Sequence, residues 1–345
     1  MSVRRTSAWV IRRLAGDSGL QRAKHVDRRW RRSVIAALDV EGRTTTRPPR
    51  AERPVVDPET RRARLIERLG QRDLSASVNQ EDLKWASPDP HVPHPHPPAS
   101  RHQLLEELHS ILEPRTYFEI GVRHGGSLTL SRTRTIGVDP AYAIKRPVQC
   151  DLRTFLETSD DFFARDDAFE HFEGTGIDLA FIDGMHMSEY VLRDFIATEA
   201  RMAPGGVVVL DDVLPRNHLE AYRIRRTGPW SGDVFKVLSV LQTHRPDLTV
   251  VPINTSPTGT LLVAGLDPTN TALADAYPDI EPTLTTPDPQ TVPADLLHRT
   301  AAVDPRDLLG SDVLTRAVAL RDKDGTTADF AALYAELNDL PRYGD

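Results

Sequence analysis

Three aspartates lie at the ends of two segments whose residues predict neighbouring strands. Asp183 ends the segment 177–183, and Asp211 ends the segment 206–211 and is followed by Asp212. Adjacent strands lie ~4.8 Å apart, so their carboxyl-terminal tips can bring these carboxylates around one ion. Oxygen ligands favour Mg²⁺ or Mn²⁺ over Zn²⁺. The sequence therefore predicts a metal site formed by the three aspartates. The alternative is that they end strands or cap helices.

His186 is the candidate catalytic residue beside this predicted metal site. It lies three residues after Asp183 and just before a predicted helix over 188–201. An imidazole whose pKa is near neutrality can take a proton from a reacting hydroxyl group. A single histidine at this position is also compatible with a surface residue or a helix cap.

A glycine-rich segment with the sequence E-I-G-V-R-H-G-G-S, residues 119–127, forms a second candidate site. Gly121 and Gly125 let the backbone approach a ligand closely, and a helix starting near Ser127 would offer unpaired N–H groups to a carboxylate. The spacing is E-x-G-x-x-x-G instead of the dinucleotide pattern G-x-G-x-x-G, and Glu119 would repel a pyrophosphate. An acid here suits a cationic ligand better, such as the amino group of methionine. A purely structural strand-to-helix turn is the alternative.

Two further acids are placed to bind the nucleoside part of a cofactor. Asp139 ends the predicted strand 135–139, 18 residues after Gly121. A carboxylate about 20 residues after the glycine turn, on the adjacent strand, can accept hydrogen bonds from both ribose hydroxyls. Asp151 follows the short segment 148–150. We predict that it lies near adenine or caps the following helix.

The elements that must position these residues alternate between short apolar segments and amphipathic helices. This alternation predicts a parallel sheet that is covered on both faces. The connection over 254–259 is short, so the last two strands should be antiparallel. Strands are predicted at 117–121, 135–139, 148–152, 177–183, 206–211, 248–253 and 260–266, and helices at 104–112, 188–201, 232–244, 308–320 and 327–337.

The order and spacing of four motifs, at 118–127, 136–139, 181–186 and 202–212, resemble those of class I S-adenosylmethionine-dependent methyltransferases. The similarity is to the branch of bacterial metal-dependent small-molecule and sugar O-methyltransferases, and it extends over residues 100–266. It implies an α/β fold with a Rossmann-like, seven-stranded, mostly parallel sheet. In that fold the last strand is antiparallel and helices cover both faces. It also implies S-adenosyl-L-methionine as the cofactor.

Together, the motifs and the resemblance predict the site residues. The predicted cofactor-binding residues are Glu119, Gly121, Gly125, Ser127, Asp139, Asp151 and Asp183. The resemblance implies that Asp183, Asp211 and Asp212 hold Mg²⁺ or Mn²⁺. It further implies that His186 is the general base for O-methylation of a sugar or catechol-like hydroxyl. Asp211 stands where a glutamate is common in the family, and its shorter side chain puts direct ligation by this residue in question.

The flanks of the chain differ from its centre in charge and composition. Residues 1–50 carry 13 Lys/Arg against 4 Asp/Glu, a net charge of +9, whereas the whole chain of 345 residues has a net charge of −7. Such an arm can bind nucleic acid, an anionic surface or another subunit, or be a solvated extension. We predict a basic N-terminal extension with short helices and Pro-rich linkers over 1–99. A methyltransferase domain follows over 100–266, and then a C-terminal extension over 267–345, mostly loop with two helices.

Composition also predicts the location and partners of the protein. Cys150 is the single cysteine, so no intramolecular disulfide forms, which fits a reducing compartment. No apolar run reaches the ~18–20 residues that cross a bilayer, and residues 8–11 are too short for a signal-peptide core. We expect a soluble, cytoplasmic enzyme that acts on a small-molecule or sugar acceptor. Membrane binding is not expected. Binding to nucleic acid is disfavoured because no aromatic recognition motif accompanies the arginines. The predicted N-terminal helices are compatible with a homo-oligomer.

Three other functions remain as alternatives. They are a metal-independent methyltransferase acting on N or O, a nicotinamide-dependent oxidoreductase, and a non-catalytic methyltransferase-like binding module. Trp230, Asp233 and Lys236 either line an acceptor pocket or serve packing and helix capping. A histidine triplet in the Pro-rich segment 87–100 also raises the possibility of a second metal site, although Pro-rich backbone rarely holds a compact set of ligands.

Overall fold

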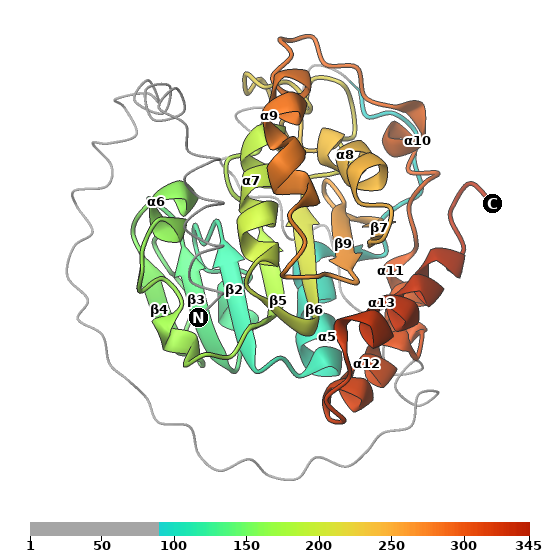
Figure 1. The fold of residues 1–345 in the computed structure, drawn as a ribbon. Coiled ribbons are helices and arrows are strands. Elements are labelled where there is room, and N and C mark those ends of the chain that lie inside the picture. Colours follow the sequence, from blue (N-terminus) through green and yellow to red (C-terminus); the bar gives the residue numbers. More distant parts are fainter. Residues whose placement is uncertain (1–89) are drawn as a thin grey trace.

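The computed structural model describes residues 90–345, and one seven-stranded sheet forms the centre of this part of the chain (Figure 1). The strand order is β4-β3-β2-β5-β6-β9-β7. All neighbours are parallel except β9, which is antiparallel to both β6 and β7. This arrangement confirms the predicted Rossmann-like sheet with an antiparallel last strand. The strands are β2 (Thr116–Ile120), β3 (Arg134–Val138), β4 (Asp151–Phe155), β5 (Ile177–Ile182), β6 (Met202–Asp211), β7 (Thr249–Ile253) and β9 (Thr260–Ala264).

Helices cover both faces of the sheet, because its central strands bury side chains on both sides. Successive residues of a strand point to opposite faces. Thus Phe118 packs in one core cluster with α6 to α9, whereas Tyr117 packs in the other with α5 and α11 to α13. The helices are α5 (Arg101–Leu112), α6 (Ser159–Phe163), α7 (Ser188–Glu199), α8 (Lys236–His244), α9 (Ala272–Leu284), α10 (Ala294–Leu297), α11 (Pro305–Gly310), α12 (Val313–Arg321) and α13 (Thr327–Ala335).

The register of the strands gathers the candidate site at one edge of the sheet. Ile120, the last residue of β2, is level with Val138 on β3 and with Ile182 on β5. Gly121, Asp139 and Asp183 each directly follow one of these residues, so all three leave the sheet at the same edge. In α/β sheets, ligands bind outside the carboxyl ends of the strands.

The C-terminal segment 267–345 differs from the prediction of a mostly irregular extension with two helices. It contributes five helices, and α9 lies against α7 and α8 while α12 and α13 lie against α5 and β6 (Figure 1). Helix α9 forms although Pro278 and Pro282 lie within it. Its buried Leu273, Tyr277, Ile280 and Leu284 recur every three or four residues, and this helical period outweighs the lost proline donors.

Two features at the start of the described chain also differ from expectation. The Pro-rich residues 90–99 are not a free linker: Asn254 donates to the carbonyl of Pro95, and strand β1 (Ala99–Ser100) pairs with β8 (Thr255–Ser256). The helices predicted upstream lie outside the described residues. After the glycine-rich turn there is no α-helix near Ser127, only the 3₁₀ turn η4 (Leu128–Leu130).

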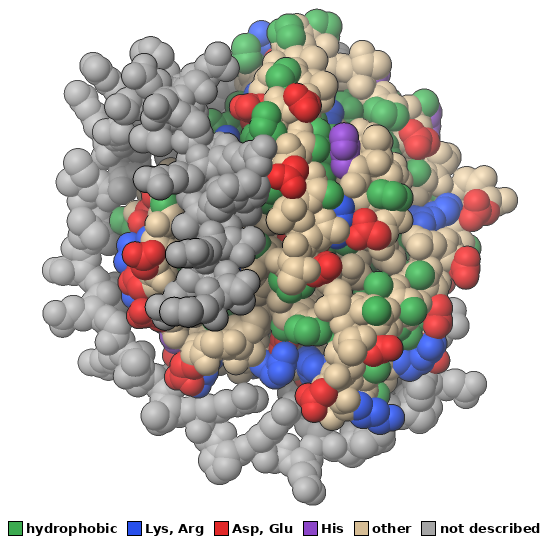
Figure 2. All heavy atoms as spheres, in the orientation of Figure 1, with side chains coloured by type: hydrophobic (Ala, Val, Ile, Leu, Met, Phe, Trp, Pro, Cys, Tyr) green, Lys and Arg blue, Asp and Glu red, His purple; other side chains and the backbone are tan. Residues whose placement is uncertain are grey.

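The face shown in Figure 2 carries acidic, basic and hydrophobic side chains interspersed over the described residues. Large exposed hydrophobic side chains within residues 90–345 include Met185 and Ile224, which are 39% and 62% exposed. No helix in this described part is long and apolar enough to cross a membrane.

Candidate functional site

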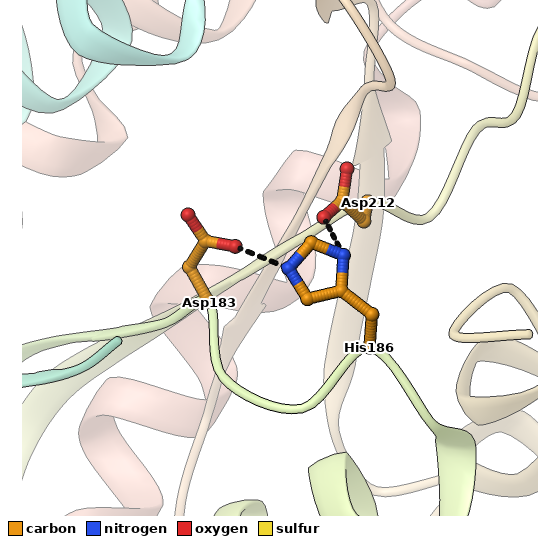
Figure 3. Close-up of side chains that lie close together, drawn as sticks. All are labelled: Asp183, His186 and Asp212. Carbon is orange, nitrogen blue, oxygen red and sulfur yellow. Dashed lines mark ion pairs between the residues drawn. The ribbon is translucent and has the colours of Figure 1, made fainter. Parts of the chain in front are cut away.

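His186 lies between two carboxylates that come from different strands (Figure 3). Its Nε2 is 3.2 Å from Oδ1 of Asp183, which follows β5, and its Nδ1 is 2.7 Å from Oδ2 of Asp212, which follows β6. One ligand atom from each of the three residues lies within 4.8 Å of the others. Within residues 90–345, this is the group of three donors that can hold a metal ion.

The loop around Trp230 fixes the orientation of the His186 ring. The two rings stack with centroids 5.2 Å apart and planes 2° from parallel, and the Trp230 carbonyl lies 2.8 Å from Nδ1 of His186. Gly232 passes so close that an added Cβ would lie 1.7 Å from the carbonyl oxygen of His186. Because Nδ1 faces two acceptors, the carboxylate of Asp212 and this carbonyl, we assign a proton to Nδ1. In the neutral imidazole, Nε2 then has the free lone pair.

The charges around His186 decide its protonation. Burial disfavours the imidazolium, but the charge of Asp212 and hydrogen bonds to Asp183 and Asp212 outweigh it, so the pKa of His186 is raised well above 6.5. Burial acts against the ionised form of Asp212 as well, yet the neighbouring His186 lowers the pKa of this carboxyl overall. The structure therefore places an ion-paired Asp–His–Asp group at the edge of the sheet.

Asp211 does not belong to this group, although it is one of the three aspartates predicted as metal ligands. Its carboxylate is buried and forms an ion pair with Arg101, with 2.6 Å between Nη1 and Oδ2. This contact is an ion pair, and Oδ2 of Asp211 accepts no hydrogen bond. Successive strand residues point to opposite sides, so Asp211, the last residue of β6, and Asp212 cannot be expected to point the same way. Asp212 instead has φ of +66° and accepts a hydrogen bond from Thr258.

Arg101 is a site residue that the strand-end reasoning missed. Burial opposes its charge, but Asp211, Asp183 and Asp212 raise the pKa of its guanidinium above the ordinary value. It is the first residue of α5, which Ser100 caps through a reciprocal pair of hydrogen bonds with Gln103. This capping box was the available signal for a helix start at Arg101, but nothing in the sequence indicated that the helix would point at the acidic centre.

The glycine-rich turn is in close contact with the backbone that follows β5. Gly121 has φ of +94°, and an added Cβ would lie 1.9 Å from the carbonyl oxygen of Asp183. Gly125 has φ of +74° and donates its N–H to the carbonyl of Val122. Both glycines therefore occupy conformations that other residues rarely adopt, and the turn lies against the loop that carries His186.

Glu119 is enclosed beneath this turn. Its two carboxylate oxygens accept hydrogen bonds from the hydroxyls of Tyr117, at 2.6 Å, and Ser127, at 2.7 Å. The side chain is fully buried, and burial raises the pKa of Glu119 to about 8 despite both hydrogen bonds. The structure thus brings the predicted cofactor residues Glu119 and Ser127 together as a buried pair.

Asp139 lies at the same edge, next to the glycine-rich turn. Its Oδ2 accepts the N–H of Arg123 at 2.7 Å, and its Oδ1 accepts the N–H of Ala141 at 2.6 Å. These bonds hold the carboxylate at the tip of β3. Each oxygen retains a second lone pair that a ligand hydroxyl can use.

Asp151 lies at the wrong edge of the sheet for its predicted role near adenine. It begins β4, instead of ending it, and is level with Arg134, the first residue of β3. Its side chain is 51% exposed and lies 3.6 Å from His171. The acid that follows the carboxyl end of β4 is Glu157, which the sequence reasoning did not select and which pairs with Arg165 at 3.6 Å.

The weaker sequence candidates separate into one site residue and two structural ones. Trp230 stacks on His186, as described above. Asp233 is fully buried, accepts the N–H of Ser188 at the start of α7, and pairs with Arg223 and Lys236. The histidine triplet is not part of a metal-binding group within residues 90–345; His94 instead contacts the carbonyl of Val92.

Comparison with known proteins identifies the type of domain. Residues 118–213, which include the glycine-rich turn, Asp139, His186 and Asp212, match a family model described as a methyltransferase domain. The match confirms, for this central part of the chain, the resemblance to methyltransferases seen in the sequence. No curated protein sequence matches the chain.

Several solved structures are similar to this chain at low sequence identity. A putative O-methyltransferase from Klebsiella pneumoniae is 15% identical, with 61% of this chain and 90% of that chain covered at a TM-score of 0.35. An O-methyltransferase from Bacillus cereus in complex with SAH is 15% identical, with coverage of 58% and 89% at 0.34. An O-methyltransferase from Streptomyces achromogenes, involved in tomaymycin synthesis and in complex with SAM, is 18% identical, with coverage of 58% and 88% at 0.36.

Proposed function

We propose that the chain is an S-adenosylmethionine-dependent O-methyltransferase that methylates a hydroxyl of a small molecule or sugar, with His186 as the general base. One observation carries this proposal. The His186 ring is held at the carboxyl edge of a methyltransferase sheet by Asp212 and Trp230, with Nε2 on the side opposite the Asp212 contact. A base oriented by a carboxylate in this way is a recurrent arrangement for removing a proton from a hydroxyl.

The residues around the glycine-rich turn support cofactor binding. The positive φ angles of Gly121 and Gly125 shape the turn that would lie beside the cofactor. Asp139 retains lone pairs for ribose hydroxyls, and Glu157 lies at the tip of the next strand toward the sheet edge. Glu119 contributes negative charge beneath a cationic ligand when it is ionised. In this proposal Asp151 has no role in binding, because it lies at the opposite edge.

Methyl transfer requires that the acceptor oxygen be aligned with the methyl group and that one proton be removed. A sulfonium methyl group is already activated, so the enzyme mainly has to bring an acceptor oxygen in line with it. Because its pKa is raised, His186 acts as a base only in its neutral form, which a higher pH favours. The acceptor O–H then gives its proton to Nε2 in place of the Asp183 contact, and its oxygen bonds to the methyl carbon as the carbon–sulfur bond breaks. The electron pair of that bond remains on sulfur. Asp212 stabilises the imidazolium that forms, and the flat ring of Trp230 keeps it in place.

A divalent ion fits this centre through two carboxylates. Asp183 and Asp212 would hold Mg²⁺ or Mn²⁺, because oxygen donors suit these ions and the two side chains approach one point from neighbouring strands. When bound, the ion lowers the pKa of the acceptor hydroxyl. Adjacent hydroxyls on a sugar or a catechol would suit such an ion, which supports this class of acceptor.

A metal-independent methyltransferase is the second candidate, and the Arg101–Asp211 ion pair favours it. With Arg101 and a protonated His186, the three aspartates already face two protein cations without any metal ion. Methyl transfer that persists after exhaustive chelation, with full activity, would identify this second candidate. Loss of activity that returns with Mg²⁺ or Mn²⁺ would identify the first.

Calorimetry of cofactor binding tests the proposal before any acceptor is known. We expect S-adenosylmethionine and its demethylated product to bind to the full chain with micromolar dissociation constants, and Asp139→Ala to weaken both. Asp151→Ala is the matched control, since it removes an acid of the same type from the other edge of the sheet and should leave binding unchanged. A methyl-transfer screen with sugars and catechols follows. Absence of binding in the wild type would contradict the proposal and favour the non-catalytic binding module.

A further inference from the structure

Arg101 is held in place before any ligand binds. Strand β1, immediately before it, pairs with β8, and the capping box of Ser100 and Gln103 starts α5 at Arg101. The helix is anchored by buried apolar residues that include Leu104, Leu105 and Leu108. The guanidinium therefore reaches the acidic centre from a rigid element.

The two nitrogens at the end of the guanidinium face two of the three aspartates. Nη1 lies 2.6 Å from Oδ2 of Asp211, and Nη2 lies 3.7 Å from Oδ2 of Asp183. The Asp211 side chain is 2% exposed, and Arg101 is its cationic partner. A buried carboxylate requires such compensation, because the cost of an unpaired buried charge is high.

The ion pair divides the three carboxylates into two groups. The residues whose donor atoms converge are Asp183, His186 and Asp212, and Asp211 is not among them. The guanidinium repels a divalent cation most strongly at the Asp211 oxygen, 2.6 Å away, and less strongly at the Asp183 oxygen, 3.7 Å away.

We infer that Arg101 is a positioning residue that withholds Asp211 from metal binding, so that Asp183 and Asp212 are the carboxylates that hold a divalent ion. This inference rests on the proposed function, because it concerns the ion proposed for that centre. It predicts a weakly bound ion, because an ion held by two carboxylates is held more weakly than one held by three. The bound ion should therefore exchange readily with solvent.

A metal titration tests this role without cofactor or acceptor. The full chain, freed of metal with a chelator, is titrated with Mn²⁺, and free Mn²⁺ is followed by electron paramagnetic resonance. In Arg101→Met, Asp211 is released, and we expect the Mn²⁺ dissociation constant to fall by about tenfold or more, since a carboxylate is added and a cation removed. Unchanged or weaker binding by a folded variant, or no measurable binding by either protein, would overturn the inference.

The double variant Arg101→Met/Asp211→Asn keeps the net charge and removes the whole pair. If Asp211 is withheld in the wild type, the double variant should bind Mn²⁺ within about threefold of the wild type. If Asp211 is a ligand, the affinity should fall by tenfold or more. This comparison remains decisive if Arg101→Met alone does not fold, because the double variant leaves no buried charge unpaired.

Arg115 offers a matched control on the same sheet. It pairs at 2.8 Å with Asp178, a carboxylate 4% exposed near the start of β5, at the opposite edge from the centre. Arg115→Met should leave Mn²⁺ affinity unchanged, and a gain equal to that of Arg101→Met would overturn the inference. The outcome for methyl transfer is separate. If the enzyme transfers methyl groups but Arg101→Met does not bind Mn²⁺ more tightly, only the role of Arg101 is contradicted. If Arg101→Met binds Mn²⁺ more tightly but the chain does not bind the cofactor, only the proposed methyl transfer is contradicted.

Discussion

At the scale of single residues, His186 combines two contacts that serve different steps. Asp212 on Nδ1 fixes the tautomer and stabilises positive charge on the ring, whereas Asp183 faces Nε2, the nitrogen that would receive the proton. A substrate hydroxyl must therefore enter close to Asp183. In the proposed mechanism the acceptor lies beside Asp183, near the point where the His186 loop touches the glycine-rich turn.

Replacement of His186 by alanine should separate catalysis from binding. General-base catalysis contributes roughly 10²–10⁴-fold to a rate, so we expect His186→Ala to lower turnover by about 100-fold or more. Cofactor affinity, measured by calorimetry, should change little because His186 lies on the acceptor side of the turn. His171→Ala, which removes a histidine at the opposite edge, should leave both quantities unchanged. Loss of cofactor binding in His186→Ala would contradict the base role.

Glu119 makes the stability of the protein dependent on pH. Burial raises its pKa to about 8 in the folded state, whereas an unfolded glutamate titrates near 4.3. At a pH between these two pKa values, the folded protein thus keeps a proton on Glu119 that the unfolded chain has lost. The contribution of Glu119 to the free energy of unfolding is fully present below about pH 4. It declines by up to roughly 1.4 kcal/mol per pH unit as the pH rises to about 8.

Glu119→Gln removes this titration. Relative to the wild type, the variant should gain stability in urea unfolding as the pH is raised from 5 to 8.5, because Gln cannot ionise. Glu173→Gln changes a glutamate whose side chain is 67% exposed, and its difference from the wild type should stay constant over this range. A constant difference for Glu119→Gln would show that Glu119 is ionised in the folded protein throughout.

At the scale of elements, the turn after β2 depends on glycine for two reasons, which can be separated. Gly121 and Gly174 have similar backbone angles, φ of +94° and +82°, but only Gly121 lies against another backbone. Gly174→Ala should cost only the strain of a left-handed residue, about 1–2 kcal/mol. Gly121→Ala must also move the carbonyl of Asp183, so we expect a larger loss of stability and loss of cofactor binding. Equal stability losses in the two variants would contradict this packing argument.

The strands that carry the site could be predicted because they are apolar on both faces and end in acids. Asp139 and Asp183 were placed correctly at one sheet edge for this reason. Strand β4 is an edge strand with the sequence D-L-R-T-F, and its polar residues gave no periodic signal. The more apolar residues just before it drew the predicted strand three residues too early, and this shift moved Asp151 to the wrong edge.

Contacts between distant elements could not be predicted from the local sequence. Whether Asp211 or Asp212 faces His186 depends on the backbone at the end of β6, and the partner of Asp211 comes from α5, more than 100 residues earlier. Helix α9 was missed because its two prolines and the polar residues around it are typical of irregular structure. The helix is explained by its packing against α7 and α8, which the local sequence does not indicate.

At the scale of the whole molecule, the C-terminal segment completes both helical layers and reaches the site. Arg299 is fully buried and donates hydrogen bonds to Asn254, at 2.6 Å, and to the carbonyls of Leu214 and Pro257, at 3.2 and 2.6 Å. These acceptors belong to the loop after β6 and to the connection between β7 and β9. The same connection contains Thr258, which donates to Asp212. The segment thereby supports the carboxylate that orients His186.

Two buried residues of this segment should therefore affect the enzyme differently. Phe330 on α13 packs on Gly205, near the amino-terminal end of β6 and away from the site. Phe330→Ala should lower the free energy of unfolding by about 3–5 kcal/mol while the folded fraction keeps its turnover. Arg299→Met leaves several buried acceptors without a donor, each costing roughly 1–3 kcal/mol, and frees the Thr258 connection, so turnover per folded molecule should fall as well. Urea unfolding and turnover measured well below the unfolding transition separate the two effects. If Arg299→Met keeps wild-type turnover per folded molecule, the C-terminal segment supports the fold without acting on the site.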